Sequence, residues 1–432
     1  MLEQYTLPEM GNIFSLENRY QLMTDVIITV CEALSDIGQI PYEDYLLLKQ
    51  KAHVEPSRVE ELERRFNHNT LAFIFALSES VGPDLDRYLH MGISNTDISD
   101  FATALQVTAA SDLLHTKLDK LRGILHDMAI EYKYTYMAGR THGTFTEPIT
   151  FGLKLAAWLK EVDRCITRLY NARNTMSVGK INGMVGTYSS VDPSVELFVC
   201  RRLGLQRAEV TTQIIQRDRM AEYVTMLALI GSSLEKFASE IRTLQRTEIA
   251  EVEEAMDPIL TETVSMPHKR RPYRCEVICG LARVLRGNSL TAMEDIVIWG
   301  EKDSSHSPAE RVVLGDSCIM LDYMLALFCD VMSTLQVYPE RMSKNLEDNL
   351  GLVFSQRVQL SLVEQGVPRD LAFNLVRRNA EEAWDQQGDF QYLLLQDEEI
   401  RKYMSRQQIM ELFDYHWFIR YIDYIFERAG IN

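Results

Sequence analysis

Four clusters of polar residues interrupt an otherwise apolar chain, and each holds groups that could take part in chemistry. In the first, Ser94, Asn95 and Thr96 stand directly before a predicted helix. The first N–H groups of a helix have no partner within it, so this turn could bind a carboxylate. An ordinary helix start also explains the three residues, because they are preferred N-cap types.

The second cluster, Gly139-Arg-Thr-His-Gly-Thr-Phe-Thr-Glu-Pro148, places His142 among turn-forming residues between two long helical stretches. An imidazole can donate or accept a proton near neutral pH, which suits general acid or base catalysis. A single histidine in a loop can also be structural or simply exposed. The other clusters must therefore decide what His142 does.

The third cluster spans residues 257–272. Several hydroxyl side chains come first, and the cationic run His268-Lys-Arg-Arg271 then lies between two prolines. Such a composition predicts a mobile loop, of the kind that often carries functional residues. A nucleic-acid or localisation patch is the alternative interpretation, but it is a weak one for so short a run in an acidic protein.

The fourth cluster runs from Trp299 to Arg311 and ends at the start of another predicted helix. Its Lys302, Ser307 and Arg311 could bind a phosphate or a carboxylate through charge-assisted hydrogen bonds. A helix-capping loop explains the serines equally well.

The composition is that of a globular protein, with 46% hydrophobic and 25% charged residues among 432. A net charge of −17 argues against general adhesion to nucleic acid, although a small basic pocket can still concentrate anions. The sequence shows neither an evident membrane span nor a secretory or transit signal, so we expect a cytoplasmic protein. The seven scattered cysteines fit reduced core thiols, and no second pair accompanies Cys275 and Cys279 to make a metal site.

Helices must position these clusters, because apolar residues recur at spacings of three and four over long intervals. We predict helices at 17–37, 97–131, 147–177, 208–254, 270–293 and 308–337, then shorter ones at 357–365, 369–384 and 406–429. The interval 208–254 would be about 60 to 70 Å long as one helix. Helices of this length usually pack in a bundle that other subunits cover, which predicts an obligate oligomer. Strand content should be slight, with a short hairpin or loop at 180–187.

Taken in order, these clusters resemble the signatures of the fumarase and aspartase superfamily, and specifically of its adenylosuccinate lyase branch. The likeness spans most of the chain, and its motifs follow one another at matching intervals. The residues that carry it are Tyr5 to Glu32, Asn67-His68-Asn69, His90 to Asp97, Gly139 to Gly143, Gln213 with Arg217-Asp218, Met266-Pro-His-Lys269 and Glu301 to Arg311.

This resemblance implies an all-α subunit of three domains, at residues 1–95, 96–347 and 348–432, whose long central helices form the core of a homotetramer. Each active site would be assembled from three subunits. The expected partner is a small succinyl-amine or succinyl-nucleotide substrate, with no nucleic acid and no membrane, and neither a metal nor an organic cofactor is needed.

The implied reaction is a β-elimination that releases fumarate, from adenylosuccinate to leave AMP and from the related succinyl-carboxamide ribotide of purine biosynthesis. A base removes the Cβ proton of the succinyl group, an aci-carboxylate forms, and a general acid protonates the departing nitrogen. Since a carbon-bound proton beside a carboxylate is very weakly acidic, donors such as Ser94, Asn95 and Lys269 must stabilise the dianionic intermediate.

The resemblance also assigns roles to individual residues. His142 would be the general acid, with His68 as its neighbour, and Thr263 would be the base on the signature loop, with Ser265 as the second candidate. The expected substrate contacts are Gln4, Tyr5, Asn67, Asn69, His90, Ser94, Asn95, Thr141, Gln213, Val264, Met266, Arg271, Lys302, Ser307 and Arg311.

Several of these positions depart from the family pattern, so the substrate is less firmly predicted than the reaction. Thr263 and Val264 replace a pair of serines. Elsewhere Gln4 replaces arginine, Asn69 aspartate, Thr144 glutamine, Arg271 asparagine and Lys302 arginine. The alternatives are a lyase for another N-succinyl compound, a cycloisomerase of carboxymuconate type, and a catalytically silent binding or structural homologue.

Overall fold

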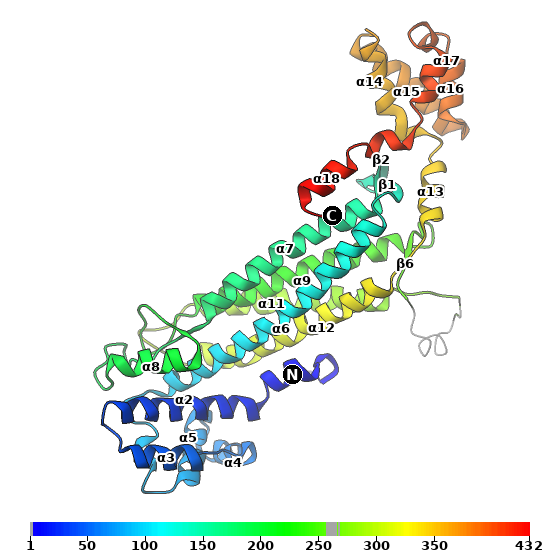
Figure 1. The fold of residues 1–432 in the computed structure, drawn as a ribbon. Helices are drawn as coiled ribbons and strands as arrows, with labels where there is room; N and C mark the ends of the chain where they lie inside the picture. The colour runs from blue at the N-terminus through cyan, green and yellow to red at the C-terminus, as the bar shows by residue number, and fades with distance from the viewer. Residues whose placement is uncertain (1–2, 256–265, 267) are drawn as a thin grey trace. The chain divides into compact units, whose positions relative to one another are not determined.

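The computed structural model describes residues 3–255, 266 and 268–432, and most of these residues are helical, which confirms the all-α prediction. The chain divides into two compact units, one of residues 1–120, 164–236 and 277–328 and the other of 121–163, 237–276 and 329–432. The long helices contribute segments to both units: α6 (Asn95–Glu131), α7 (Phe151–Met176), α9 (Asp218–Leu244), α11 (Tyr273–Glu294) and α12 (His306–Thr334) (Figure 1).

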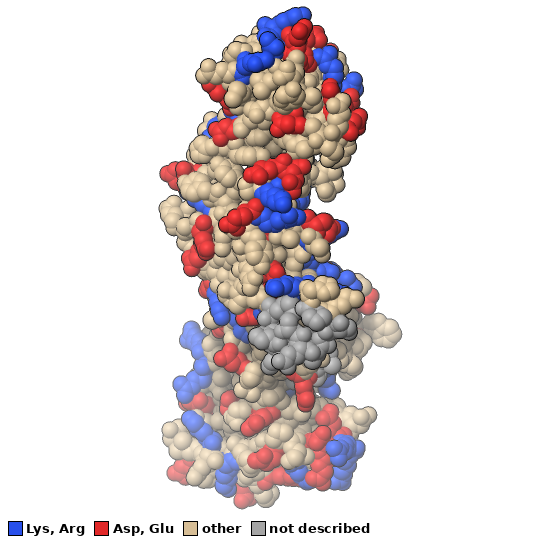
Figure 2. Space-filling model, turned by 90° about the vertical axis from the view of Figure 1, so that its right-hand side faces the viewer, with Lys and Arg blue, Asp and Glu red and all other residues tan. Residues whose placement is uncertain are grey.

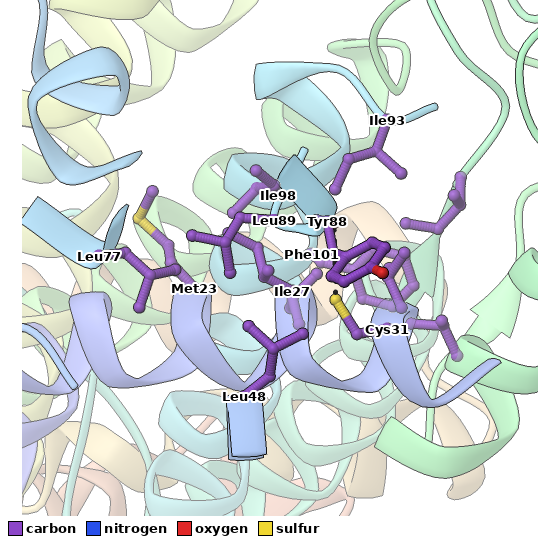
Figure 3. Packing of buried hydrophobic residues seen from close by; sticks show 14 of the residues in the cluster. Met23, Ile27, Cys31, Leu48, Leu77, Tyr88, Leu89, Ile93, Ile98 and Phe101 are labelled. Carbon is purple, nitrogen blue, oxygen red and sulfur yellow. Dashed lines mark hydrogen bonds between the residues drawn. The ribbon is translucent and has the colours of Figure 1, made fainter. Parts of the chain in front are cut away.

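The first unit begins with helices α1 (Pro8–Ile13), α2 (Leu16–Asp36), α3 (Tyr42–Lys51), α4 (Pro56–Phe66) and α5 (Asn69–Val81), and with 3-10 turns η1 (Glu3–Tyr5) and η2 (Asp86–Tyr88). It also holds α8 (Pro193–Leu203) and the short parallel strands β3 (Val178–Gly179) and β4 (Gln206–Arg207). Its core is one buried cluster that includes Ile27 of α2, Leu48, Leu77 and Phe101 (Figure 3). These side chains are fully buried, and each stabilises the fold by roughly 1.5–3 kcal/mol.

Close packing of α9, α11 and α12 in the first unit explains the single glycine in the central helical pattern. A Cβ atom on Gly231 would lie 2.6 Å from Cδ1 of Leu285 and 3.6 Å from Cε of Met324. Since real Cβ contacts are longer than the first of these distances, a larger residue at position 231 would require the end of the Leu285 side chain to move. Glycine therefore lets α9 pack closely against α11 at this crossing.

The second unit contains the antiparallel hairpin of β1 (Tyr136–Thr141) and β2 (Thr144–Thr150), and the strand pair β5 (Val252–Glu253) and β6 (Gln336–Val337). Its C-terminal helices are α13 (Pro339–Glu347), α14 (Ser355–Glu364), α15 (Arg369–Gln386), α16 (Phe390–Gln396), α17 (Arg406–Glu411) and α18 (Ile422–Ala429), with 3-10 turns η3 (Leu352–Phe354), η4 (Ile400–Lys402) and η5 (Tyr415–Ile419). Leu362, Leu375, Phe390 and Ile400 form the core of α14 to α17.

Most predicted helices agree with the observed ones to within a few residues. The prediction of one continuous helix over 208–254 was wrong. Helix α9 covers only 27 residues, about 40 Å at 1.5 Å per residue. Ile214 and Val252, which seemed to continue its period, are buried in a bend and in β5 instead. Periodicity records burial, and loop residues can be buried at helical spacing.

One further predicted helix differs from the structure, because the interval 406–429 is broken into α17, η5 and α18. Residues 180–187 form a loop, which is one of the two forms expected for them. The β1–β2 hairpin was not predicted. The division into three domains stays a prediction.

Helix α12 has the length and mean hydropathy of a membrane span, which the sequence analysis did not anticipate. However, 67% of its apolar window is buried inside the protein, as in the core helix of a soluble protein. The seven cysteines are buried as expected. On the face that Figure 2 shows, the basic and acidic side chains of the described residues are interspersed rather than gathered into fields of one sign.

Candidate active site

A cavity of about 390 Å³ in the first unit brings together residues from several of the sequence motifs. The predicted site residues among them come from the junction of α4 and α5, the start of α6, and the segment that leads into α12. The predicted site residues in its wall are Asn67, His68, Asn69, Asn95, Lys302, Ser307 and Arg311. Segments distant in sequence thus converge on one cavity.

The wall formed by α4 and α5 turns sharply at Asn67, whose left-handed backbone (φ 51°) ends α4. His68 then caps α5: its Nδ1 accepts a hydrogen bond from the backbone N–H of Leu71 at 3.2 Å. Because Nδ1 acts as an acceptor, the ring proton of neutral His68 lies on Nε2, which is left available as a donor. Asn69 is held by hydrogen bonds from Nδ2 to Oη of Tyr20 at 3.0 Å and to Glu63 at 2.9 Å.

The turn at the start of α6 is held by reciprocal hydrogen bonds. The N–H of Ser94 donates to Oδ2 of Asp97 at 2.6 Å, and the N–H of Asp97 donates to Oγ of Ser94 at 3.2 Å. Ser94 is only 1% exposed and does not line the cavity, so its hydroxyl serves the turn. Asn95 and Thr96 line the cavity instead.

Two further predicted residues support this turn from outside the wall. Nε2 of His90 lies 3.0 Å from Oδ1 of Asn95, and Oγ1 of Thr96 donates to the backbone carbonyl of Gln213 at 2.7 Å. Gln213 is thereby joined to the start of α6, although its own side chain does not line the cavity.

A buried ion pair lies behind the turn. The ammonium group of Lys180 contacts Oδ1 of Asp97, and both side chains are 0% exposed. Burial raises the pKa of the Asp97 carboxyl, while the adjacent ammonium opposes that shift. With an ammonium in direct contact, we assign the charged pair to the folded state, because either group alone would be a buried, uncompensated charge.

The cations at the other side of the cavity differ in how they are neutralised. Arg217 is bound to two carboxylates, with Nη2 3.1 Å from Asp100 and 3.3 Å from Glu310. Lys302 and Arg311 have no ion pair among the described residues, and burial lowers the pKa of Lys302 against the opposing charge of Asp100. Cations without a carboxylate partner in a cavity wall suit an anionic ligand.

His142 lies in the second unit, at the exposed tip of the β1–β2 hairpin. Thr141 pairs with Thr144 across a two-residue turn in which both His142 (φ 54°) and Gly143 (φ 79°) are left-handed. This is the backbone of a type I′ turn, in which histidine is tolerated and glycine is favoured. Oγ1 of Thr144 donates to the carbonyl of Thr141 at 3.0 Å, so the residue that replaces the family's glutamine helps to close the turn.

The hairpin is anchored by a buried carboxylate. Glu251, whose side chain is 0% exposed, accepts from Nη2 of Arg140 at 2.5 Å and from Nη1 at 3.0 Å. Nδ2 of Asn345 donates to the same group at 2.8 Å. A larger cavity of about 760 Å³ lies between this hairpin and α13. Of the described positions that depart from the family pattern, only Thr144 lines it.

The signature segment is described only in part. Thr263, Val264 and Ser265 lie outside the described residues, and Met266, His268, Lys269 and Arg271 are exposed. The guanidinium of Arg271 stacks over the ring of Tyr273 at 5.7 Å. At the N-terminus, Gln4 is exposed and the ring of Tyr5 lies against that of Tyr323, with centroids 5.3 Å apart. Neither Gln4 nor Tyr5 lines the 390 Å³ cavity.

Comparison with known proteins gives this arrangement its context. Residues 4–287 match the Lyase family, and residues 351–429 match the family described as adenylosuccinate lyase C-terminus. The chain is 43% identical over 431 residues to an adenylosuccinate lyase of Bacillus subtilis, with 100% of both chains covered. It is also 43% identical over 432 residues to adenylosuccinate lyase of Aquifex aeolicus, with 99% of both covered.

The chain belongs to the adenylosuccinate lyase family.

Solved structures place the fold in the same superfamily. A fumarate lyase from Mesorhizobium sp. BNC1 superposes with a TM-score of 0.90 at 25% identity, covering 98% of both chains. The 3-carboxy-cis,cis-muconate lactonizing enzyme from Pseudomonas putida gives 0.90 at 26% identity, covering 98% of this chain and 96% of that one. Sequence identity is higher to the adenylosuccinate lyase family, which separates this chain from the cycloisomerase alternative.

Several cavity residues were not among the predicted contacts of this adenylosuccinate lyase family member. They include Arg19, Asp100, Arg217, His306 and Glu310. Arg19 looks like an ordinary solvated arginine in an amphipathic helix, and only the fold reveals its position. His306 is buried, burial lowers its pKa, and its Nδ1 has no hydrogen-bond partner among the described residues.

Proposed function

We propose that this chain cleaves adenylosuccinate to AMP and fumarate, and cleaves the related succinyl-carboxamide ribotide in the same way. Its identity of 43%, over the full length, to enzymes named adenylosuccinate lyase carries the proposal. The cavity agrees in chemistry, because its Lys302 and Arg311 have no carboxylate partner within the described part of the chain and lie beside a helix start that can bind a carboxylate. We expect the enzyme to act in the cytoplasm without a metal or organic cofactor.

In this proposal the anionic ends of the substrate are bound by different parts of the cavity. Lys302, Ser307 and Arg311 would contact the phosphate, since they provide two cations and a hydroxyl at the entry of α12. Asn95 and Thr96 would contact a succinyl carboxylate at the positive end of α6. Together these contacts would hold the succinyl carbon where a base can reach its proton.

The elimination then needs one base and one acid. Thr263, or Ser265 as second candidate, would take the Cβ proton, and Lys269 would stabilise the aci-carboxylate. His142 would donate a proton to the nitrogen as the carbon–nitrogen bond breaks, giving fumarate and the free amine. An imidazole exposed at a rigid hairpin tip can reach into a site on another subunit.

We also propose that the active sites of a homotetramer are shared between subunits. Mixing a His142→Asn variant with a His68→Asn variant tests this. A shared site that takes His68 from the first chain and His142 from the second would contain both histidines. Recovery of a substantial fraction of activity after mixing and reassembly supports shared sites, whereas no recovery contradicts them. Light scattering of the wild-type protein gives the oligomeric state.

Fumarate release from purified protein tests the proposed reaction. Adenylosuccinate should be cleaved, and Thr263→Ala should abolish turnover while Ser265→Ala retains more of it. Full activity of Thr263→Ala would rule out this residue as the base. Binding of adenylosuccinate without turnover would instead favour a catalytically silent homologue.

A second candidate is a lyase for another N-succinyl amine. The changes at Gln4, Asn69, Thr144, Arg271 and Lys302 favour it, because lysine lacks the bidentate geometry of arginine and Gln4 carries no charge. Cleavage of a different succinyl amine under conditions where adenylosuccinate is inert would select this alternative.

A further inference from the structure

Arg19 occupies an unusual place for a residue near the start of a surface helix. It lies in the first turns of α2, is half-buried, and lines the cavity that holds Lys302 and Arg311. Its Nη1 donates to Oε1 of Gln106 at 3.3 Å. Gln106 is itself buried and is oriented by a hydrogen bond from Nε2 to the carbonyl of Ile13 at 2.8 Å, so its oxygen is directed to the guanidinium.

The guanidinium of Arg19 has no carboxylate partner among the described residues. Asp100 and Glu310, the acids that line the cavity near it, are both bound by Arg217, and Glu63 accepts a hydrogen bond from Asn69. Burial lowers the pKa of Arg19 and the nearby charge of Arg311 lowers it further, against the opposing charges of Asp100 and Glu310. A partly desolvated guanidinium beside a second one is unfavourable unless an anion compensates the two charges.

The N-terminal residue that the family uses for phosphate is changed in this chain. Gln4 stands where the family has an arginine, it is exposed, and it does not line the cavity. Arg19 does line the cavity and carries the charge that Gln4 lacks. Two guanidinium groups can each bind a phosphate dianion through paired N–H donors.

We propose that Arg19 binds the phosphate monoester of the nucleotide substrate together with Arg311. The inference deepens the proposed function and rests on it for the identity of the nucleotide. The competing explanation is structural: Arg19 would only join α2 to Gln106, and no ligand would contact it.

Two substrates that differ only in the phosphate distinguish these explanations. For Arg19→Gln we expect KM for adenylosuccinate to rise about tenfold to a hundredfold, the range for a lost charge-assisted hydrogen bond, with kcat within about threefold of wild type. KM for succinyladenosine, which has no phosphate, should change by less than about twofold. Arg19→Lys should lie in between, since it keeps the charge and loses the paired donors. Equal rises in KM for both substrates would overturn the proposal.

Binding of inorganic phosphate tests the site without any turnover. Calorimetry should give a Kd for wild type that Arg19→Gln weakens about tenfold or more, whereas Arg377→Gln, a matched change at an exposed arginine on α15, leaves it unchanged. An unchanged Kd in Arg19→Gln overturns the proposal. If the wild-type chain binds phosphate but does not cleave adenylosuccinate, the proposed function fails while the role of Arg19 in anion binding stands.

A second variant covers the case in which Arg19→Gln does not fold, as judged by circular dichroism and gel filtration. Gln106→Met removes the hydrogen bond that orients Arg19 and keeps a side chain of similar length. We expect it to weaken phosphate binding about twofold to fivefold. No change in Kd would show that the orientation of Arg19 does not matter to the anion.

Discussion

His68 caps helix α5 through its own ring, with Nδ1 accepting the N–H of Leu71 at 3.2 Å. One side chain therefore supports the fold with one nitrogen and presents the other at a cavity wall. In the neutral ring this contact places the proton on Nε2.

Two substitutions at His68 should separate the structural role from the chemical one. Asparagine is a good N-cap residue, so His68→Asn should keep the free energy of unfolding within about 0.5 kcal/mol, whereas His68→Ala should lower it by about 0.5–2 kcal/mol. Both should lose most activity. Urea unfolding and initial rates measure the two effects, and equal stability of the two variants would contradict the capping role.

His142 allows a similar separation at the hairpin tip. Asparagine adopts the left-handed backbone of a type I′ turn more readily than histidine, so His142→Asn should leave thermal stability unchanged or slightly higher. If His142 is the general acid, kcat should fall by about a hundredfold to ten-thousandfold. Activity close to wild type would remove this residue from the mechanism.

The buried pair of Lys180 and Asp97 predicts a large asymmetry between single and double substitution. Lys180→Met leaves a buried, uncompensated carboxylate and should lower the free energy of unfolding by about 3–5 kcal/mol. Adding Asp97→Asn should recover more than half of that loss, because asparagine can still accept the N–H of Ser94. As a control, Arg64→Met removes an exposed pair with Glu60 and should cost less than about 1 kcal/mol. A double variant no more stable than Lys180→Met would contradict the pairing.

Asp295 predicts a pH dependence of stability. Burial and the charge of Glu310 raise the pKa of its carboxyl to about 6, and its Oδ2 is buried without a hydrogen bond among the described residues. Since the pKa is higher in the folded chain than in the unfolded one, the favourable contribution is present below about pH 4 and is lost as the pH rises through about 6. Asp295→Asn should therefore stabilise the protein more at pH 7.5 than at pH 4.5. An equal difference in urea midpoint at the two pH values would count against this shift.

The sequence predicts most of this fold because long helices repeat their apolar spacing many times. The prediction fails where buried residues are not in a helix. Ile214 and Val252 are buried at helical spacing, but neither is helical. The hairpin that carries His142 was missed because histidine followed by glycine is not among the common type I′ pairs.

For the site, sequence motifs predict which segments converge but not which atoms face the cavity. Ser94 was expected to contact the substrate, yet its hydroxyl is directed into the turn, and Asn95 is in the wall. Arg19 could not be found from the sequence, since its role depends on Gln106, far along the chain, and on the carboxylates that Arg217 already occupies. The sequence around Arg19 does not indicate that Arg217 binds these carboxylates.

The seven buried thiols can report on local opening of the helices that carry them. Burial raises the pKa of Cys31, Cys200 and Cys318 to about 12, so in the closed state these groups offer almost no thiolate to an alkylating reagent. Labelling must then wait for a helix to open, and mass spectrometry of each cysteine peptide over time would rank the helices by how often they do so.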